Sequence, residues 1–162
     1  MLVAVLALSL AGIGLATFLV ANHYQYVGAE FCSIGPLLSC ENVNTGPYST
    51  IPEGGGGIPW SVIGLASFVV MFALAYLRLY YPHKDTKGLF LPLMVAVSWI
   101  GIIFVVYLNY LEVFKIHQIC LLCAVSHIIM TVISWLATCW YFYGQHGAKT
   151  EAGVETSQTP DD

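Results

Sequence analysis

The chain has 162 residues, of which 58% are apolar and only 9% charged, with a formal net charge of −4 and a mean hydropathy of +0.78. These values lie far outside the range of ordinary soluble domains and indicate an integral membrane protein. The few basic residues form no stripe, which argues against a nucleic acid as the binding partner.

Four segments are long and apolar enough to cross a bilayer, which takes about 20 such residues per helix. They are Leu2–Ala21, Pro59–Tyr81, Gly88–Tyr110 and Gln118–Tyr143. The first has neither a basic leader nor a small-residue cleavage site, so we expect a retained helix and not a signal peptide. We predict an all-α membrane protein, a bundle of four transmembrane helices with a long extracytoplasmic loop at residues 22–58.

The positions of Lys and Arg predict the orientation of the bundle, because cytoplasmic loops carry an excess of both. One side of the predicted bundle holds Arg78, Lys84, Lys87 and Lys149, and the other holds Lys115. Both termini are therefore predicted to be cytoplasmic in a multi-pass protein of the plasma membrane. The loop and the turn before the fourth helix then face a compartment where disulfides persist.

After Tyr143 the composition changes to small, polar and acidic residues, which include Glu151, Glu155, Asp161 and Asp162. Such a segment cannot bury enough apolar surface to fold alone. We therefore expect residues 1–143 to form the membrane domain and residues 144–162 to form a disordered cytoplasmic tail.

Four of the five cysteines form two pairs on the predicted outer side. Cys32 and Cys40 lie in the loop, which is long enough to reach across the mouth of the bundle at about 3.3 Å per residue. Its prolines and a run of glycines at residues 54–57 predict an irregular, partly mobile segment. Cys120 and Cys123 form a C-x-x-C at the start of the fourth helix, where both sulfurs share one face and the helix N-terminus favours the reactive thiolate.

Each cysteine pair has a plain structural alternative. Cys32 and Cys40 alone would be interpreted as a bridge that ties down a loop, and the C-x-x-C as two packed cysteines. Together, a loop dithiol facing a membrane-edge dithiol is the minimum arrangement that passes two electrons between soluble thiols and a lipid-dissolved carrier. The fifth cysteine, Cys139, lies toward the cytoplasm and is expected only to pack.

Two histidines flank the C-x-x-C. His127 lies one turn beyond Cys123, where its imidazole can hydrogen-bond a carbonyl oxygen of an apolar ring compound. A zinc site made with His117 is the competing hypothesis, but His117 and His127 are ten residues apart, or about 15 Å along a helix axis. We therefore predict no metal site.

Four membrane helices, a loop cysteine pair and a C-x-x-C that opens the last helix together resemble the vitamin K epoxide reductase family. The resemblance is carried by three segments, Cys32–Cys40, Ile58–Gly64 and Cys120–Cys123. It implies that Cys123 reacts with a quinone of the ubiquinone, menaquinone or vitamin K type, that Cys120 exchanges with Cys40, and that Cys32 meets the thiols of a thioredoxin-like or DsbA-like partner. It also implies a quinone pocket that includes Trp60, Ile63 and His127.

The resemblance implies a membrane oxidoreductase that couples quinone reduction to disulfide formation in extracytoplasmic partners. The opposite direction, reduction of vitamin K epoxide or quinone, is an alternative. An alternative of another class is a non-enzymatic tetraspan scaffold whose loop disulfide is structural, as in claudin-like proteins. The scaffold does not need a dithiol on its last helix.

Three positions depart from the family pattern. Gly46 stands where members commonly carry Ser or Thr, with Thr45 and Ser49 nearby. Trp60 stands where many members have Asn, and His127 where the vertebrate enzymes have Tyr. The missing tyrosine favours disulfide generation over epoxide reduction. Because the segment after the bundle is short and acidic, we expect a thioredoxin-like partner to act in trans.

Overall fold

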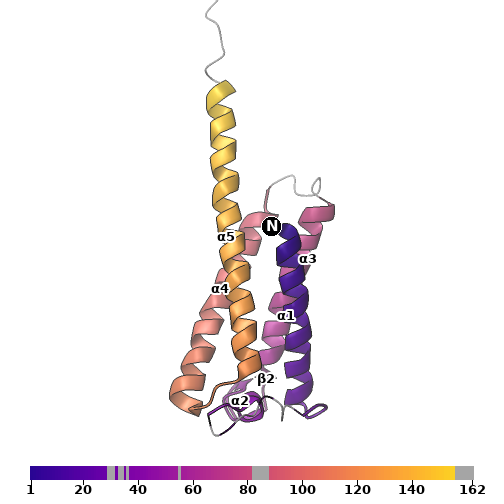
Figure 1. Ribbon diagram of the computed structural model, residues 1–162, viewed down its shortest axis with the longest axis vertical. Helices are drawn as coiled ribbons and strands as arrows, with labels where there is room; N and C mark the ends of the chain where they lie inside the picture. The colour runs from indigo at the N-terminus through magenta and orange to yellow at the C-terminus, as the bar shows by residue number, and fades with distance from the viewer. Residues whose placement is uncertain (29–31, 33–34, 36, 55, 82–87, 156–162) are drawn as a thin grey trace, which may run out of the picture.

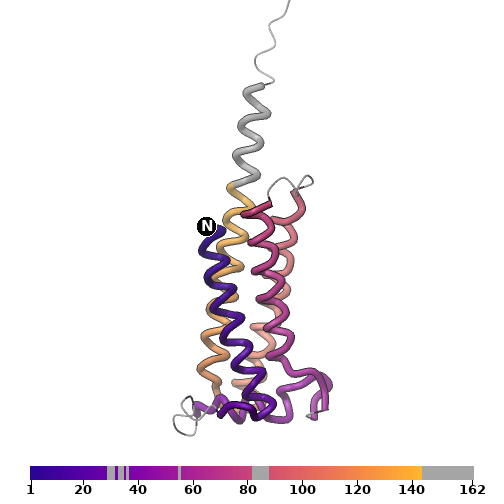
Figure 2. The backbone as a smooth tube through the Cα atoms, turned by 90° about the vertical axis from the view of Figure 1, so that its right-hand side faces the viewer, coloured from indigo at the N-terminus to yellow at the C-terminus, as the bar shows by residue number. Residues whose placement is uncertain are grey.

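The structure is a computed structural model that describes all residues except 29–31, 33–34, 36, 55, 82–87 and 156–162. Its main elements are four long helices, α1 (Leu2–His23), α3 (Trp60–Tyr80), α4 (Phe90–Leu111) and α5 (Leu121–Glu155). They run side by side as one bundle in both views (Figures 1 and 2). Each is long and apolar enough to cross a membrane. The predicted all-α bundle of four membrane helices is confirmed.

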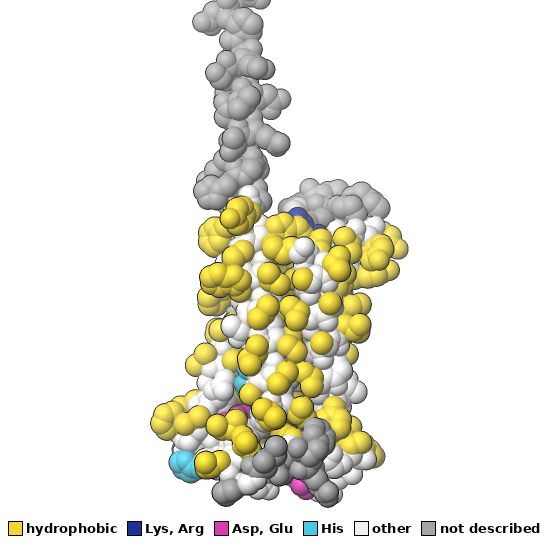
Figure 3. All heavy atoms as spheres, viewed as in Figure 1, with side chains coloured by type: hydrophobic (Ala, Val, Ile, Leu, Met, Phe, Trp, Pro, Cys, Tyr) yellow, Lys and Arg dark blue, Asp and Glu magenta, His cyan; other side chains and the backbone are white. Residues whose placement is uncertain are grey.

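Apolar side chains fill the interior of the bundle, where the largest fully buried ones are Met71, Met94 and Ile133. Helices α1 and α3 approach closely at Gly12, where an added Cβ would lie 2.5 Å from the ring of Phe68. Small residues allow such close approach between membrane helices. Hydrophobic side chains also cover the middle of the outer face shown in Figure 3, as expected of a surface that faces lipid.

The N-terminus of α1 and the C-terminal end of α3 lie at one end of the bundle, and α2 and β2 lie at the other (Figure 1). At the first end, the guanidinium of Arg78 lies 4.8 Å from the centroid of the Trp140 ring. Lys84 and Lys87, on which the predicted orientation also depends, lie outside the described residues.

The helix ends differ from the sequence-based expectations. Helix α4 continues as a π-helix, η3 (Glu112–Ile116), so the third span ends at Ile116 instead of Tyr110. Helix α5 begins at Leu121 and continues to Glu155, into the segment for which the composition predicts disorder.

The loop after α1 is more regular than its prolines and glycines predict. It contains α2 (Cys40–Thr45) and an antiparallel pair of strands, β1 (Thr50–Ile51) and β2 (Ile58–Pro59). Ser39 starts α2, because its side-chain oxygen accepts a hydrogen bond from the backbone N–H of Asn42 at 3.2 Å. Gly57 lets the strands meet, since a Cβ there would overlap the Ile51 carbonyl.

Candidate redox site

The two cysteine pairs lie at the same end of the bundle and both form disulfides. The Cys32–Cys40 bridge joins Cα atoms 5.7 Å apart, and the Cys120–Cys123 bridge joins Cα atoms 5.1 Å apart. The structure therefore places a loop cystine and a helix cystine at one end of the bundle.

A short backbone pairing brings the two cystines next to each other. Leu38 and Ile119 form a parallel β-bridge. The N–H of Ile119 donates to the Leu37 carbonyl at 2.9 Å, and the N–H of Ser39 donates to the Ile119 carbonyl at 3.2 Å. Paired strands lie about 4.8 Å apart. Cys120 directly follows Ile119, and Cys40 is two residues after Leu38. Cys32, Cys40 and Cys120 consequently belong to one buried cluster with Leu19 and Val43.

The four sulfurs differ in accessibility. Cys40 and Cys120 are fully buried and Cys32 is 1% exposed, whereas Cys123 is half-buried and borders a cavity. The family resemblance implies that Cys32 meets a soluble partner, but its side chain is covered in this structure. A partner thiol can reach Cys32 only if the segment that carries it moves.

Cys120 lies immediately before α5 and caps the N-terminus of this helix. Its sulfur accepts a hydrogen bond from the backbone N–H of Cys123 at 3.1 Å, and its carbonyl accepts one from Ala124 at 2.9 Å. The sulfur thus takes the place of the oxygen of a Ser or Asp cap. A thiolate at this position is stabilised by the helix dipole and by that N–H group.

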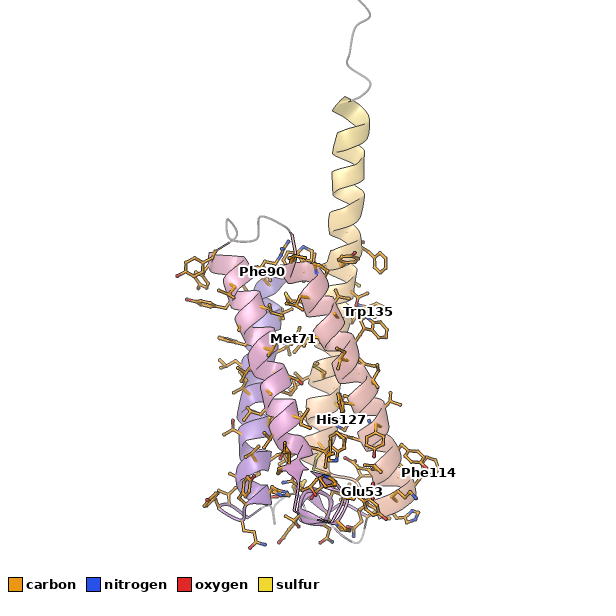
Figure 4. The ribbon with its side chains drawn as sticks, turned by 180° about the vertical axis from the view of Figure 1, so that it is seen from behind. Glu53, Met71, Phe90, Phe114, His127 and Trp135 are labelled. Carbon is orange, nitrogen blue, oxygen red and sulfur yellow. A yellow bond between two sulfur atoms is a disulfide. The ribbon has the colours of Figure 1, made fainter. Side chains whose placement is uncertain are left out.

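A cavity of about 130 Å³ lies between the helices beside Cys123. A cavity needs only roughly 10–15 Å³ of such space to hold one water molecule, so this cavity can hold a larger group. Trp60, Ile63 and His127, which the resemblance assigns to a quinone pocket, all line it together with Cys123. Figure 4 shows His127 on α5 in the lower part of the bundle, above the loop that carries Glu53.

Trp60 links the loop to the helices and forms an aromatic wall of the cavity. Its indole N–H donates to the Tyr48 carbonyl at 3.1 Å, and its backbone N–H donates to the Ser49 carbonyl at 3.0 Å. The centroid of its ring lies 5.7 Å from the ring centroid of Phe104 and 5.4 Å from that of Tyr107. These are typical distances for stabilising aromatic pairs.

Glu112 is a site residue that the sequence interpretation missed. Its side chain is 5% exposed, lines the cavity, and accepts a hydrogen bond from the backbone N–H of Cys120. It is the first residue of η3, and π-helical turns occur often at functional sites. The available signal was an acidic residue at the end of an apolar span, because an ionisable group inside a membrane bundle is a functional candidate by default.

Asn44 is a second residue that the sequence interpretation missed. Its side-chain nitrogen donates to the Leu19 carbonyl at 2.6 Å and to Asn22 Oδ1 at 3.0 Å. In addition, His23 Nδ1 donates to the Asn44 carbonyl at 2.6 Å. These buried bonds fasten α2, and therefore Cys40, to the end of α1.

The departure at Gly46 has a steric explanation. A Cβ on Gly46 would lie 2.5 Å from the backbone oxygen of Asn42, so the Ser or Thr of other members does not fit this backbone. The neighbouring hydroxyls bond locally, from Ser49 to the Gly46 carbonyl at 2.7 Å and from Thr45 to the Glu41 carbonyl at 2.8 Å. Of Thr45, Gly46 and Ser49, only Ser49 lines the cavity.

The remaining sequence-based expectations concern a metal site and Cys139. Within the described part of the chain, no three or more His, Cys, Asp or Glu side chains are grouped so that they could hold a metal ion. Cys139 is a free, half-buried cysteine on α5. It lies outside the buried cluster that contains Cys32, Cys40 and Cys120.

A loop cystine beside a helix cystine, with the latter opening into an apolar cavity inside a four-helix bundle, defines a membrane redox protein. The model of the Vitamin K epoxide reductase family matches residues 3–138, and the chain therefore belongs to this family. No curated protein matches the sequence. The match spans all four paired cysteines and all three expected pocket residues, and it confirms the resemblance. The protein is accordingly a multi-pass membrane oxidoreductase.

Proposed function

We propose that the protein is a quinone-dependent thiol–disulfide oxidoreductase that forms disulfides in extracytoplasmic, thioredoxin-like or DsbA-like partners. The proposal rests on the positions of the cysteines, which form a series that runs from the loop to the cavity. Cys40 lies beside Cys120 through the Leu38–Ile119 bridge, and Cys123 borders the cavity. Electrons that enter at the loop thus have a route to the interior of the bundle.

The first half of the reaction transfers two electrons from the partner to the loop. A partner thiolate attacks Cys32 and releases Cys40, and the second partner thiol then attacks the mixed disulfide. The partner leaves with a disulfide, and Cys32 and Cys40 remain as a dithiol. Because Cys32 is covered, this step requires displacement of the segment around it.

The second half moves the electrons inward. The Cys40 thiolate attacks Cys120 and releases Cys123 as a thiolate, and Cys32 then attacks Cys40 to restore the loop disulfide. Cys120 and Cys123 are left as the dithiol, with the Cys120 sulfur held by the backbone N–H of Cys123. Reoxidation of this dithiol gives two electrons to the bound quinone, and two protons accompany them.

The cavity residues fit a quinone. Most of the lining is apolar, as an isoprenoid ring compound requires, with Trp60 as a flat aromatic wall. The Ser61 hydroxyl lines the cavity and is buried without a hydrogen-bond partner among the described residues, so it is free to bond a carbonyl oxygen. His127 offers a second polar group on the other side of the bundle, on α5.

Glu112 is the group that we assign to proton transfer. Its carboxyl lies between the backbone of Cys120 and the cavity that Cys123 borders. Thiols lose protons when the cystines re-form, and the quinone gains protons when it is reduced. A carboxyl in contact with both regions is suited to take a proton from one and deliver it to the other.

The proposed direction is from partner to quinone, with the active end facing the extracytoplasmic side and both termini in the cytoplasm. His127 in place of the tyrosine of the vertebrate enzymes supports a quinone, and not vitamin K epoxide, as the electron acceptor. The Lys and Arg distribution supports the orientation. Reduction of vitamin K epoxide by the same partner dithiol, with the epoxide in place of the quinone as electron acceptor, remains the competing activity in the test below.

The test is quinone-dependent oxidation of a reduced thioredoxin-like protein by membranes that contain the protein. We expect Cys123→Ala to abolish this turnover, while Cys139→Ala, which removes the cysteine outside the two pairs, leaves it unchanged. Undiminished turnover in Cys123→Ala would refute the electron route. If the wild-type protein instead consumes vitamin K epoxide faster than quinone, the proposed electron acceptor is wrong.

A further inference from the structure

A side-chain pair between α4 and α5 sets the chemistry of the cavity wall. The side-chain nitrogen of Asn109 lies 3.2 Å from Nδ1 of His127 and donates a second hydrogen bond to the Val105 carbonyl at 2.8 Å. Asn109 lies on the outer surface of α4, and His127 lines the cavity. The pair therefore joins the lipid-facing surface to the candidate quinone site.

The two hydrogen bonds of the Asn109 side chain determine which atoms of Asn109 and His127 carry hydrogen. A carbonyl oxygen can only accept, so the group that faces Val105 must be the amide nitrogen and not the amide oxygen. The same nitrogen faces His127 Nδ1, which must therefore act as an acceptor. An imidazolium carries hydrogen on both nitrogens and would place two donors against each other. His127 is consequently the neutral imidazole with its hydrogen on Nε2.

We infer that Asn109 is a positioning residue that holds His127 as an Nε2–H donor toward a carbonyl oxygen of the quinone. This inference rests on the proposed function, since it specifies how the cavity recognises its ligand. The other neutral tautomer would present a lone pair at Nε2, which repels a carbonyl oxygen. With Asn109 in place, the donor is available before the ligand binds, and binding requires no exchange of tautomers.

The donor also has a consequence for the direction of the reaction. Negative charge grows on the quinone oxygens as electrons arrive, and a fixed N–H group stabilises the charged oxygen more than the neutral carbonyl. The Asn109–His127 pair therefore assists reduction of the quinone more than it assists its binding. A loss of Asn109 is expected to lower kcat more than it raises KM.

The experiment uses the full-length protein in detergent or nanodiscs, with a short-chain ubiquinone and a short-chain menaquinone as probes. We measure kcat and KM for Asn109→Leu, His127→Phe and the double variant, with Thr131→Val as the control. The Thr131 hydroxyl bonds only the His127 backbone carbonyl at 2.8 Å, also on an exposed surface, so its loss leaves the imidazole hydrogens unchanged. In parallel, ¹⁵N NMR of the imidazole reports which nitrogen carries hydrogen.

We expect hydrogen on Nε2 of His127 in the wild-type protein and a mixture of tautomers in Asn109→Leu. Turnover should fall by roughly tenfold or more in Asn109→Leu, with little further loss when this change is added to His127→Phe. Hydrogen on Nδ1 in the wild-type protein would overturn the inference without any variant. An equal loss from Asn109→Leu in the His127→Phe background would also overturn it, because the residue would then act independently of the histidine.

Failure of the proposed function has a different signature. In that case the wild-type protein shows no quinone-dependent thiol oxidation, while the NMR spectrum still reports the state of the imidazole. The two readouts therefore separate an incorrect role for Asn109 from an incorrect function for the site.

Discussion

Leu38 and Ile119 form a parallel backbone bridge at the mouth of the bundle, and each is followed closely by a cysteine of a different disulfide. This bridge places Cys40 beside Cys120, although the two cysteines are 80 positions apart in the sequence. Both sulfurs are fully buried. Exchange between them is thus a local event in a dry environment, and no reach across the bundle is needed.

Trapping experiments test this neighbour relationship. In a Cys32→Ser, Cys123→Ser double variant, we expect mild oxidation to produce an intramolecular Cys40–Cys120 disulfide, detected by mass spectrometry of proteolytic peptides. The matched variant that keeps Cys40 and Cys139 as its only cysteines should form no such bond, because Cys139 lies outside the buried cluster. A non-exchanging scaffold would give no Cys40–Cys120 product under partial reduction of the wild-type protein either.

Replacing Glu112 by Gln keeps the shape of the side chain and removes its ability to carry a proton. We expect quinone-dependent turnover to fall by about 10²-fold, a typical contribution of general acid–base catalysis. Trapping of the Cys40–Cys120 bond should persist in Glu112→Gln. Glu53→Gln changes an exposed carboxyl on the loop and is the control. Equal turnover in the two variants would contradict the role of Glu112.

The aromatic wall of the cavity predicts a graded response at Trp60. Trp60→Phe keeps a flat ring against Phe104 and Tyr107 but removes the hydrogen bond to the Tyr48 carbonyl. Trp60→Ala removes both features. We expect KM for a short-chain quinone to rise little in Trp60→Phe and roughly tenfold in Trp60→Ala, since aromatic contacts contribute about 0.5–1.5 kcal/mol beyond burial. Identical KM values in all three proteins would place the quinone elsewhere.

The hydrogen bonds of Asn44 predict a loss of stability when they are removed. Asn44→Leu removes the second donor to the Leu19 carbonyl and leaves the buried Asn22 Oδ1 without its donor, at a penalty of about 1–3 kcal/mol for the unsatisfied group. Thr45→Ala is the control, because its hydroxyl makes only an exposed bond within α2. Thermal unfolding in detergent should show a clear decrease for Asn44→Leu and little change for Thr45→Ala. Comparable melting temperatures would show that the network does not anchor α2.

The four spans and the cysteine pairs were predictable because they are local properties of the chain. An apolar run of membrane length identifies a helix without any knowledge of its neighbours, and the C-x-x-C spacing places two sulfurs on one helix face. The ends were harder to predict. The continuation of α4 into η3 and the regular structure in the loop depend on contacts such as the Ser39 cap and the close approach at Gly57.

The site was only partly predictable for the same reason. Cys123, Trp60, Ile63 and His127 were assigned to a common pocket by resemblance, and they line one cavity. The burial of Glu112 depends on how α4, which continues into η3, packs against α3 and α5, and no local pattern encodes this packing. The coverage of Cys32 likewise depends on tertiary packing, because a cysteine in a polar loop is expected to be accessible.

The complete burial of Cys120 shields one sulfur of the inner cystine from small reductants in the surrounding water. A small dissolved thiol such as glutathione finds no surface of the Cys120 sulfur to attack, and the half-buried Cys123 borders the cavity. Under the proposed function, the group in place to attack this sulfur is the Cys40 thiolate of the loop. Selectivity for the electron donor is thereby built into the packing around one sulfur atom.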